Sequence, residues 1–242
     1  MKKRLFDIIL SGAGLVCFLP ILIPTIILIW LQDFRSPFYI APRMLTPNKK
    51  FNMLKLRSMV ANADKIGGTS TAQTDMRITL IGHFIRKCKL DEISQLWNVL
   101  IGDMSLVGPR PQAERDARLY TKEENKLFNL KPGITDFSSI VFSDEGNILA
   151  GSTNPDLKYN QIIRPWKSRL GLFYIDNQKL SVDLQLIYLT VIALFSRSCA
   201  LTKMVRLLTK LKADPAIIKI ASRKDTLVPF PPPGMEEVEI RY

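Results

Sequence analysis

The chain has 242 residues, of which 47% are hydrophobic and 23% charged, and its formal net charge is +12. This composition excludes a disordered chain and indicates a folded domain, with room for a membrane segment. The basic excess indicates an anionic partner: nucleic acid, a phospholipid surface or a phosphorylated substrate. The three cysteines are far apart and form no CxxC pair, so they predict neither a disulfide framework nor a zinc site.

An uncharged run of 25 residues, 8–32, follows a basic start at residues 2–4. A helix needs only about 20 residues to cross a bilayer, so a single-pass transmembrane helix is the simple interpretation. Pro20 and Pro24 interrupt the run, however, and each removes a backbone hydrogen bond. Six lysines and arginines between 35 and 57 also make the second flank basic, which places both flanks in the cytoplasm. We therefore expect a re-entrant hairpin that breaks near Pro20.

The next part of the chain alternates between polar and apolar segments. Residues 33–50 are rich in proline and arginine and predict a loop or a short extended segment. Residues 51–60 fit either a strand or the start of a helix, and the polar residues 62–75 predict a mobile loop. From 79 to 100, apolar residues recur at helical spacing and predict one helix or two.

The second half of the chain predicts further helices. We expect a charged helix over about 112–128 and another over about 156–176. The run 184–195 is strongly apolar but too short for a membrane span, so a buried or interfacial helix is expected there. The proline-rich stretch 229–233 predicts an unstructured or extended tail.

Residues 197–224 hold eight lysines and arginines and one aspartate. Their apolar residues fall on one helical face: Leu201, Met204, Val205, Leu208 and Leu211. This pattern predicts an amphipathic helix that lies in an anionic lipid surface. A helix that packs on the domain and exposes a basic face remains the alternative.

Two adjacent carboxylates, Asp91 and Glu92, lie between basic residues, with Arg86 before them and Arg110 after. Buried carboxylates need partners. A divalent cation and phosphate groups would serve, since Mg²⁺ is often held by one or two carboxylates and arginine pairs well with phosphate. The group therefore suggests phosphoryl chemistry. Without more information, acidic residues in the first turn of a helix remain the alternative.

Five blocks in chain order carry a resemblance to a known family. They are Lys3-Arg4-Leu5-Phe6-Asp7, Lys55-Leu56-Arg57-Ser58-Met59, Asp75-x-Arg77-x-Thr79 with Gly82 and Arg86, the block from Leu90 to Pro111, and Lys131-Pro132-Gly133-Ile134-Thr135. They resemble the bacterial sugar transferase family of polyprenyl-phosphate phosphoglycosyl transferases, in which Pro20 matches the break in the membrane helix. The resemblance covers roughly residues 2–200, and the block from 90 to 111 is long and specific.

The resemblance implies a two-step reaction on a UDP-sugar and a polyprenyl phosphate such as undecaprenyl phosphate. Asp91 would attack the sugar-bearing phosphorus and release UMP, and the acceptor phosphate would then attack the aspartyl phosphosugar. Glu92 would act as a general base or as an orienting group. Mg²⁺ on Asp91 would neutralise charge. Arg86 and Arg110 would hold phosphates, and Lys55 and Arg57 are further candidates for that role, although basic residues near a membrane also meet lipid.

The expected fold is mainly α with a few short β-strands. The re-entrant membrane helix would occupy 1–34, a compact cytoplasmic catalytic domain 35–196, and a basic amphipathic helix with the tail 197–242. We expect an enzyme at the cytoplasmic face of the bacterial inner membrane that contacts membrane lipid and binds no nucleic acid. The sequence leaves the sugar, the glycan pathway and the oligomeric state open, with a homo-oligomer among the alternatives.

The chain departs from the family pattern at three places. Leu19 stands where a serine usually precedes the helix-breaking proline. After Thr135 the usual Gly-Trp-Ala-Gln-Val-x-Gly-Arg is replaced by the acidic segment 136–146, which puts the family's sugar-side contacts in doubt. An acidic residue is also missing from the stretch 171–174. A membrane-bound scaffold without activity and a nucleic-acid-binding protein are the rival interpretations; the intact Asp91 and Glu92 disfavour the first, and the uncharged run disfavours the second.

Overall fold

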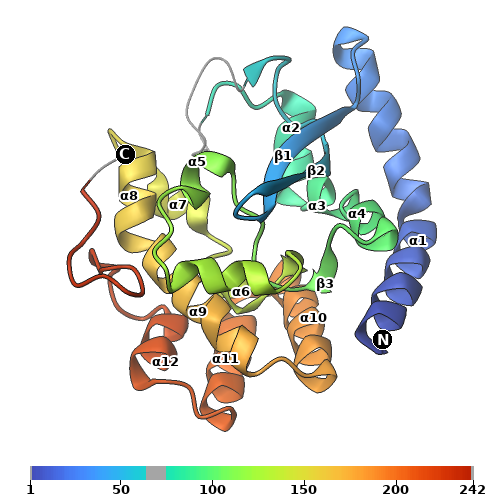
Figure 1. Cartoon of the computed structure of the whole chain (residues 1–242). Coiled ribbons are helices and arrows are strands. Elements are labelled where there is room, and N and C mark those ends of the chain that lie inside the picture. The colour runs from blue at the N-terminus through green and yellow to red at the C-terminus, as the bar shows by residue number, and fades with distance from the viewer. Residues whose placement is uncertain (1, 64–74, 241–242) are drawn as a thin grey trace.

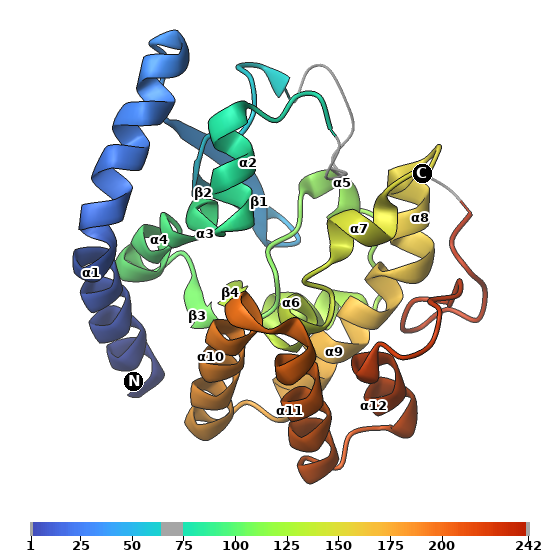
Figure 2. The same cartoon turned by 180° about the vertical axis from the view of Figure 1, so that it is seen from behind.

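The N-terminal apolar run forms one long helix, α1 (Lys2–Asp33), along one side of the molecule (Figures 1 and 2). The structure is a computed structural model that describes residues 2–63 and 75–240. It is mainly helical with a few short strands, as the sequence predicts. Within the described residues, α1 is the one helix long and apolar enough to cross a membrane. Most of the loop predicted at 62–75 lies outside the described residues.

The structure differs from the expected hairpin, because α1 continues as a helix through Pro20 and Pro24. A proline inside a helix removes one hydrogen bond and crowds the preceding turn, and this can bend a helix without reversing the chain. The Thr25 hydroxyl donates to the Ile21 carbonyl at 2.8 Å within the same turn. The chain turns away only after Asp33, where Phe34 adopts a left-handed φ of 54°.

The first turns of α1 are held to the domain by the residues of the opening Lys-Arg-x-x-Asp block. Lys3 donates to Asp183 at 2.5 Å, and Arg4 donates to the carbonyls of residues 99 and 100 at 2.5 and 2.7 Å. The buried Asp7 accepts from the Ser105 hydroxyl at 2.9 Å and from the backbone N–H of Leu106 at 3.1 Å. This block therefore fixes the start of α1 against the core.

The far end of α1 is also attached to the domain. Arg57 binds both carboxylate oxygens of Asp33 at 2.6 Å. Leu22 and Ile29 of α1 are buried in a small apolar cluster together with Leu56, Ile85 and Leu90. Both ends of α1 therefore contact the same domain, and the helix runs beside it instead of projecting from it.

The strands form two small sheets. β1 (Phe38–Thr46) and β2 (Lys49–Leu56) are an antiparallel hairpin, with Ala41 opposite Met53. β3 (Ser105–Val107) and β4 (Gly133–Thr135) pair in parallel. The backbone segments at Gly108 and Gly133 lie very close together beside this pair. A Cβ on Gly133 would lie 2.1 Å from the Gly108 nitrogen, so glycine is required there. The expected extended segments at 33–60 are thus one hairpin.

The helical pattern predicted for 79–100 forms three short helices because Lys89 has a left-handed φ of 52° and Ser94 and Gln95 separate the next two. The charged helix expected over 112–128 is wrong in extent: only two short turns form there, and the helix expected over 156–176 is divided at Ile163. The observed helices in this part of the chain are α2 (Leu80–Lys87), α3 (Leu90–Ile93), α4 (Leu96–Ile101), α5 (Glu114–Ala117), η2 (Glu124–Asn129), α6 (Phe137–Val141), α7 (Glu145–Leu149), α8 (Pro155–Ile162) and α9 (Arg164–Asp176).

Three further helices complete the core: α10 (Leu180–Phe195), α11 (Arg197–Lys210) and α12 (Pro215–Ser222). The apolar face of α11 is buried against its neighbours, with Met204 and Leu208 both at 0% exposure. The prediction that this face lies in lipid is therefore wrong, and the domain-packing alternative is confirmed. Since α11 and α12 share the main core with α6, α9 and α10, this core continues past the expected boundary after residue 196 (Figure 2).

The exposed apolar surface lies instead on α10 and α1. α10 buries Leu186 and Leu189 but leaves an apolar stripe exposed: Leu180, Leu184, Tyr188, Val191, Leu194 and Phe195. The outer face of α1 is also apolar and exposed along most of its length. The ion pair between Lys3 and Asp183 joins the start of α1 to the start of α10, so the two apolar surfaces are neighbours (Figure 1).

The proline-rich tail forms no helix or strand within the residues described, but it lies against the domain. The Phe230 ring stacks on Trp166 with 4.5 Å between the ring centroids. The backbone N–H of Phe230 donates to the Gln161 carbonyl at 2.9 Å. Arg169 donates to the Pro231 carbonyl at 2.8 Å. Of the two alternatives for this tail, the extended one is confirmed and the unstructured one is wrong, because the tail lies in place over α8 and α9.

Replacement of Asp7 by alanine is predicted to destabilise the fold. It removes two hydrogen bonds and leaves the buried N–H of Leu106 and the hydroxyl of Ser105 without an acceptor, at about 1–3 kcal/mol. The unfolding temperature in detergent should fall by about 3–10 °C. The exposed Asp176, replaced by alanine in the same way, should leave it unchanged. Equal unfolding temperatures for the two variants would show that this anchor contributes nothing.

Candidate active site

Asp91 and Glu92 lie on α3, a helix of four residues. Both side chains are partly buried, with 17% and 22% of their surfaces exposed. A helix this short is not stable alone, so tertiary contacts must position it. Leu90 provides one contact, because it is buried in the apolar cluster beneath α1. Lys89 has a left-handed backbone conformation, which turns the chain sharply after α2 and so sets the direction of α3.

Side chains that follow α3 attach this segment to strand β2. The Ser94 hydroxyl donates to the Leu54 carbonyl at 3.1 Å. The Asn98 amide accepts from the Leu54 N–H and donates to the Asn52 carbonyl, both at 2.8 Å. Asn98 therefore satisfies the edge of the strand as a neighbouring strand would. These bonds fix Lys55, the next residue on β2, beside α3.

The structure brings four of the predicted bases and acids together directly. The Lys55 ammonium lies 4.0 Å from the nearer carboxylate oxygen of Asp91. The Arg110 guanidinium donates with two nitrogens to one oxygen of Glu92, both at 3.4 Å. Each carboxylate thus faces a different cation.

Arg86 belongs to the same site, whereas Arg57 does not. Arg86 donates to the Ser58 hydroxyl at 3.0 Å, and its charge offsets part of the rise that burial causes in the pKa of Asp91. Arg57 instead binds Asp33 at the end of α1. β2 ends at Leu56, so Arg57 lies outside the strand. Its side chain therefore need not point to the same face of the sheet as that of Lys55. We assign Arg57 to the anchorage of α1.

The electrostatics give the two carboxylates different properties. Burial raises the pKa of Asp91, and the neighbouring Glu92 adds to this, although Lys55 opposes it. Burial also acts to raise the pKa of Glu92, but Arg110, Lys89 and Lys55 outweigh it, and the net direction is downward. Burial lowers the pKa of Lys55. Glu92 is therefore a stable anion paired with Arg110, and Asp91 is the more basic carboxylate.

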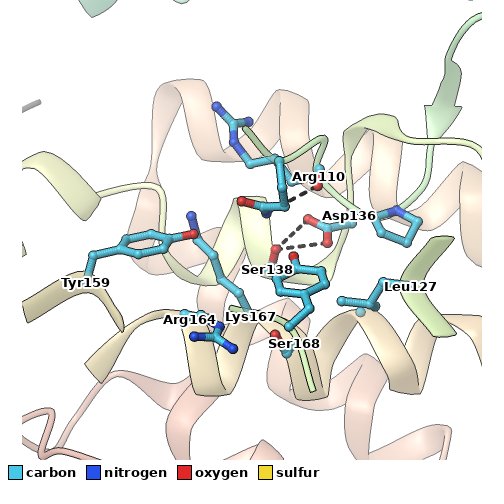
Figure 3. A pocket seen from close by; sticks show the side chains of 12 residues that line it. Arg110, Leu127, Asp136, Ser138, Tyr159, Arg164, Lys167 and Ser168 are labelled. Atoms are coloured by element: carbon cyan, nitrogen blue, oxygen red, sulfur yellow. Dashed lines mark hydrogen bonds between the residues drawn. The ribbon is translucent and has the colours of Figure 1, made fainter. Parts of the chain in front are cut away.

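Sequence reasoning missed several residues around Arg110. Arg43 on β1 lies near it, and burial lowers the pKa of Arg43. Behind Arg110 lies a cavity lined by polar side chains that include Asp136, Tyr159 and Lys167 (Figure 3). Its volume of about 20 Å³ is enough for a bound water. No motif marks these residues, because they come from separate elements.

The described residues contain no group of three or more histidine, cysteine or acidic side chains placed to share a metal. Mg²⁺ is nevertheless often bound through one or two carboxylates together with substrate phosphates. Asp91 and Glu92 supply such a donor set, so the residues present fit the expected ion.

Taken together, the fold and site define a protein with a long apolar helix and two carboxylates set among basic side chains. The chain belongs to the bacterial sugar transferase family, whose model matches residues 1–197.

Curated relatives agree with this assignment. The chain is 34% identical over 189 residues to an uncharacterized sugar transferase, EpsL, of Bacillus subtilis (strain 168), a match that covers 78% of this chain and 85% of the relative. It is 35% identical over 198 residues to the undecaprenyl-phosphate glucose phosphotransferase of Komagataeibacter xylinus, covering 79% of this chain and 35% of that protein. It is also 38% identical over 148 residues to the UDP-galactose-lipid carrier transferase of Erwinia amylovora, covering 55% of this chain. The chain thus spans 31% and 35% of the length of the Erwinia and Komagataeibacter proteins.

Replacement of Lys55 by methionine is predicted to raise the pKa of Asp91 further. The ammonium favours the ionised carboxylate, so its loss moves the titration of Asp91 to higher pH. Carbon-13 NMR of labelled aspartate carboxyls would measure this, with Asp91→Asn assigning the signal. Lys50→Met, on the same strand but paired with Glu114, is the matched control and should cause no shift. A downward shift in the Lys55 variant would contradict the site electrostatics.

Proposed function

We propose that this protein transfers a phosphosugar from a UDP-sugar to a polyprenyl phosphate such as undecaprenyl phosphate. The products are a polyprenyl diphosphosugar and UMP, and the reaction begins the assembly of a surface polysaccharide or another glycan. The observation that carries the proposal is the pairing of Asp91 with Lys55 and of Glu92 with Arg110 in a member of the sugar transferase family. Relatives named for phosphosugar transfer to undecaprenyl phosphate support the acceptor.

In the first step, an oxygen of Asp91 attacks the phosphorus that bears the sugar. The bond from this phosphorus to the oxygen bridging the two phosphates breaks, and UMP leaves with that oxygen. The carboxylate then carries the phosphosugar as a mixed anhydride. The raised pKa of Asp91 suits this role, since a more basic carboxylate is a better nucleophile while it stays ionised.

In the second step, an oxygen of the polyprenyl phosphate attacks the same phosphorus, and the Asp91 carboxylate leaves. The acceptor phosphate is already largely ionised near neutral pH, so it needs little help from a base. Glu92 is better suited to hold Arg110, because the two are paired and the pKa of Glu92 is lowered.

The bases of the site bind and neutralise the phosphates. Arg110 and Arg86 have planar guanidinium groups that match phosphate oxygens, and Lys55 adds a point charge beside the nucleophile. Asp91 is the residue that would hold Mg²⁺, which when bound supplies positive charge to the diphosphate. With phosphates held on both sides of Asp91, the attacking oxygen and the phosphorus are kept in line.

The apolar surfaces of α1 and α10 support a position at the membrane face. A polyprenyl phosphate keeps its chain in the bilayer and its head group at the interface, so its enzyme needs a site at that level. We propose that α1 enters the lipid from the cytoplasmic side and does not cross it, because both of its ends contact the same domain. UDP-sugars are then available from the cytoplasm.

Replacement of Asp91 by asparagine is predicted to abolish UMP release from a panel of UDP-sugars in the presence of Mg²⁺ and undecaprenyl phosphate. Without the acceptor, the wild-type protein should gain the mass of one phosphosugar, while the Asp91 variant gains none. Intact-protein mass spectrometry and a UMP assay make the two measurements.

The matched control is Asp176→Asn, which removes an exposed carboxylate at the end of α9. It should keep wild-type activity and the mass gain. Full activity in the Asp91 variant would overturn the assignment of the nucleophile. If the wild-type protein released UMP from none of the UDP-sugars in the panel, the proposed function would be overturned.

Paired substitution of Leu184 and Val191 by glutamate is predicted to weaken membrane association. Their side chains are 50% and 49% exposed on α10, and a charge there costs free energy in lipid. Flotation with vesicles of phosphatidylethanolamine and phosphatidylglycerol should show a partition coefficient about tenfold lower. The control pair, Thr202→Glu and Thr209→Glu, changes the exposed face of α11 and should have a much smaller effect. Equal flotation of both double variants would exclude α10 from the lipid-binding surface.

A further inference from the structure

The acidic segment 136–146 departs from the family pattern, and the structure gives each of its carboxylates a distinct partner. Asp136 begins α6 and accepts from the N–H of Ser139 at 2.7 Å and from the hydroxyl of Ser138 (Figure 3). It is therefore a helix cap. Asp144 and Glu145, at the start of α7, face two other groups of bases, and their roles differ.

Asp144 is held by residues of the C-terminal helices. Arg197 lies 2.9 Å from one of its oxygens and Arg223 lies 3.1 Å from the other. Arg197 also donates to the Ser143 hydroxyl at 3.2 Å, and the guanidinium of Arg223 lies over the Phe142 ring at 5.4 Å. Arg223 comes from beyond the family match, which ends at residue 197. The segment after that point thus fixes the loop at 142–144.

Glu145, the next residue, has its partner in the lining of the cavity beside Arg110. It pairs with Lys167 of α9, whose side chain is only 9% exposed and whose ammonium also lies 5.2 Å from the centre of the Tyr159 ring. The Glu145 side chain itself is 35% exposed. Lys167 and Arg110 line the same cavity, so Glu145 lies on the side of the site where Arg110 is (Figure 3). Burial acts to raise the pKa of Glu145, but Lys167, Arg110 and Lys55 outweigh it, and the net direction is downward. Glu145 is therefore an accessible anion at the border of the site.

An anion at this position does not attract a phosphate. The phosphates of the donor belong on Arg86, Arg110 and Lys55, and the sugar is bonded directly to the phosphorus that Asp91 attacks. The sugar therefore lies next to these bases, and Glu145 borders them on the side of Arg110. A carboxylate accepts hydrogen bonds from hydroxyl, amide or amino groups, and it repels another carboxylate.

We propose that Glu145, held by Lys167, forms the sugar-recognition wall of the site, and that Asp144, bound by Arg197 and Arg223, positions it. This inference rests on the proposed function. The donor sugar is then neutral or amino-substituted, with O–H or N–H groups directed at Glu145, and uronic acid donors are rejected by like charge.

The test compares UDP-glucose, UDP-N-acetylglucosamine and UDP-N-acetylgalactosamine with UDP-glucuronic acid, by kcat/KM for UMP release. For Glu145→Gln, the preference for the best neutral donor over UDP-glucuronic acid should fall about tenfold, mainly through KM. Glu123→Gln, which removes a carboxylate paired with Lys126 elsewhere, should leave the preference unchanged. An unchanged preference in the Glu145 variant overturns the inference.

The positioning role is tested at Arg223. Arg223→Gln should lower the same preference in the direction of Glu145→Gln, and Arg223→Lys should restore most of it because it keeps the charge. Lys219→Gln removes an exposed charge from α12 and is the matched control. A loss of kcat for all donors with an unchanged preference would show a merely structural role for Arg223. UMP release from no donor by the wild type would overturn the proposed function and this inference with it.

Discussion

The packing of α1 behind the catalytic segment is the interaction on which the rest of the structure depends. Leu22 and Ile29 of the apolar helix are buried against Leu56, Ile85 and Leu90, and Leu90 directly precedes Asp91. α3 is too short to hold its own conformation, so this apolar contact and the bonds from Asn98 to β2 determine where the carboxylates lie. The long apolar helix and the short helix that bears the two candidate catalytic carboxylates are thus one packed unit.

A similar dependence on distant parts of the chain appears around the cavity beside Arg110. α7, α8 and α9 supply Glu145, Tyr159 and Lys167, and the C-terminal helices and tail cover these elements from outside. Most of the tail's contacts are made by its backbone, through the carbonyl of Pro231 and the N–H of Phe230. The chain beyond residue 197 therefore supports α8 and α9 from outside, although it lies outside the family match.

The sequence predicts the catalytic group better than its surroundings. Asp91, Glu92, Lys55, Arg86 and Arg110 lie in contiguous motifs, and the structure brings them together. Arg57 goes to Asp33 because the strand ends just before it, which no motif reveals. The amphipathic pattern of α11 is the same for a face against lipid and a face against protein, and only the fold shows that α6, α10 and α12 cover it. The prolines of α1 indicate a break, but the tertiary contacts at both ends of the helix decide its course.

The anchorage of α1 also bears on how the protein is made. The partner of Lys3 is Asp183, which follows it by 180 residues. Ser105 and Leu106, which donate to Asp7, follow Asp7 by 98 and 99 residues. At a synthesis rate of 5–20 residues per second, the apolar helix leaves the ribosome on the order of 10–40 s before its last partner exists. During that interval the domain contacts that cover one face of α1 are missing. The domain therefore closes on α1 only late in synthesis, and α3 takes its final position against a helix that already exists.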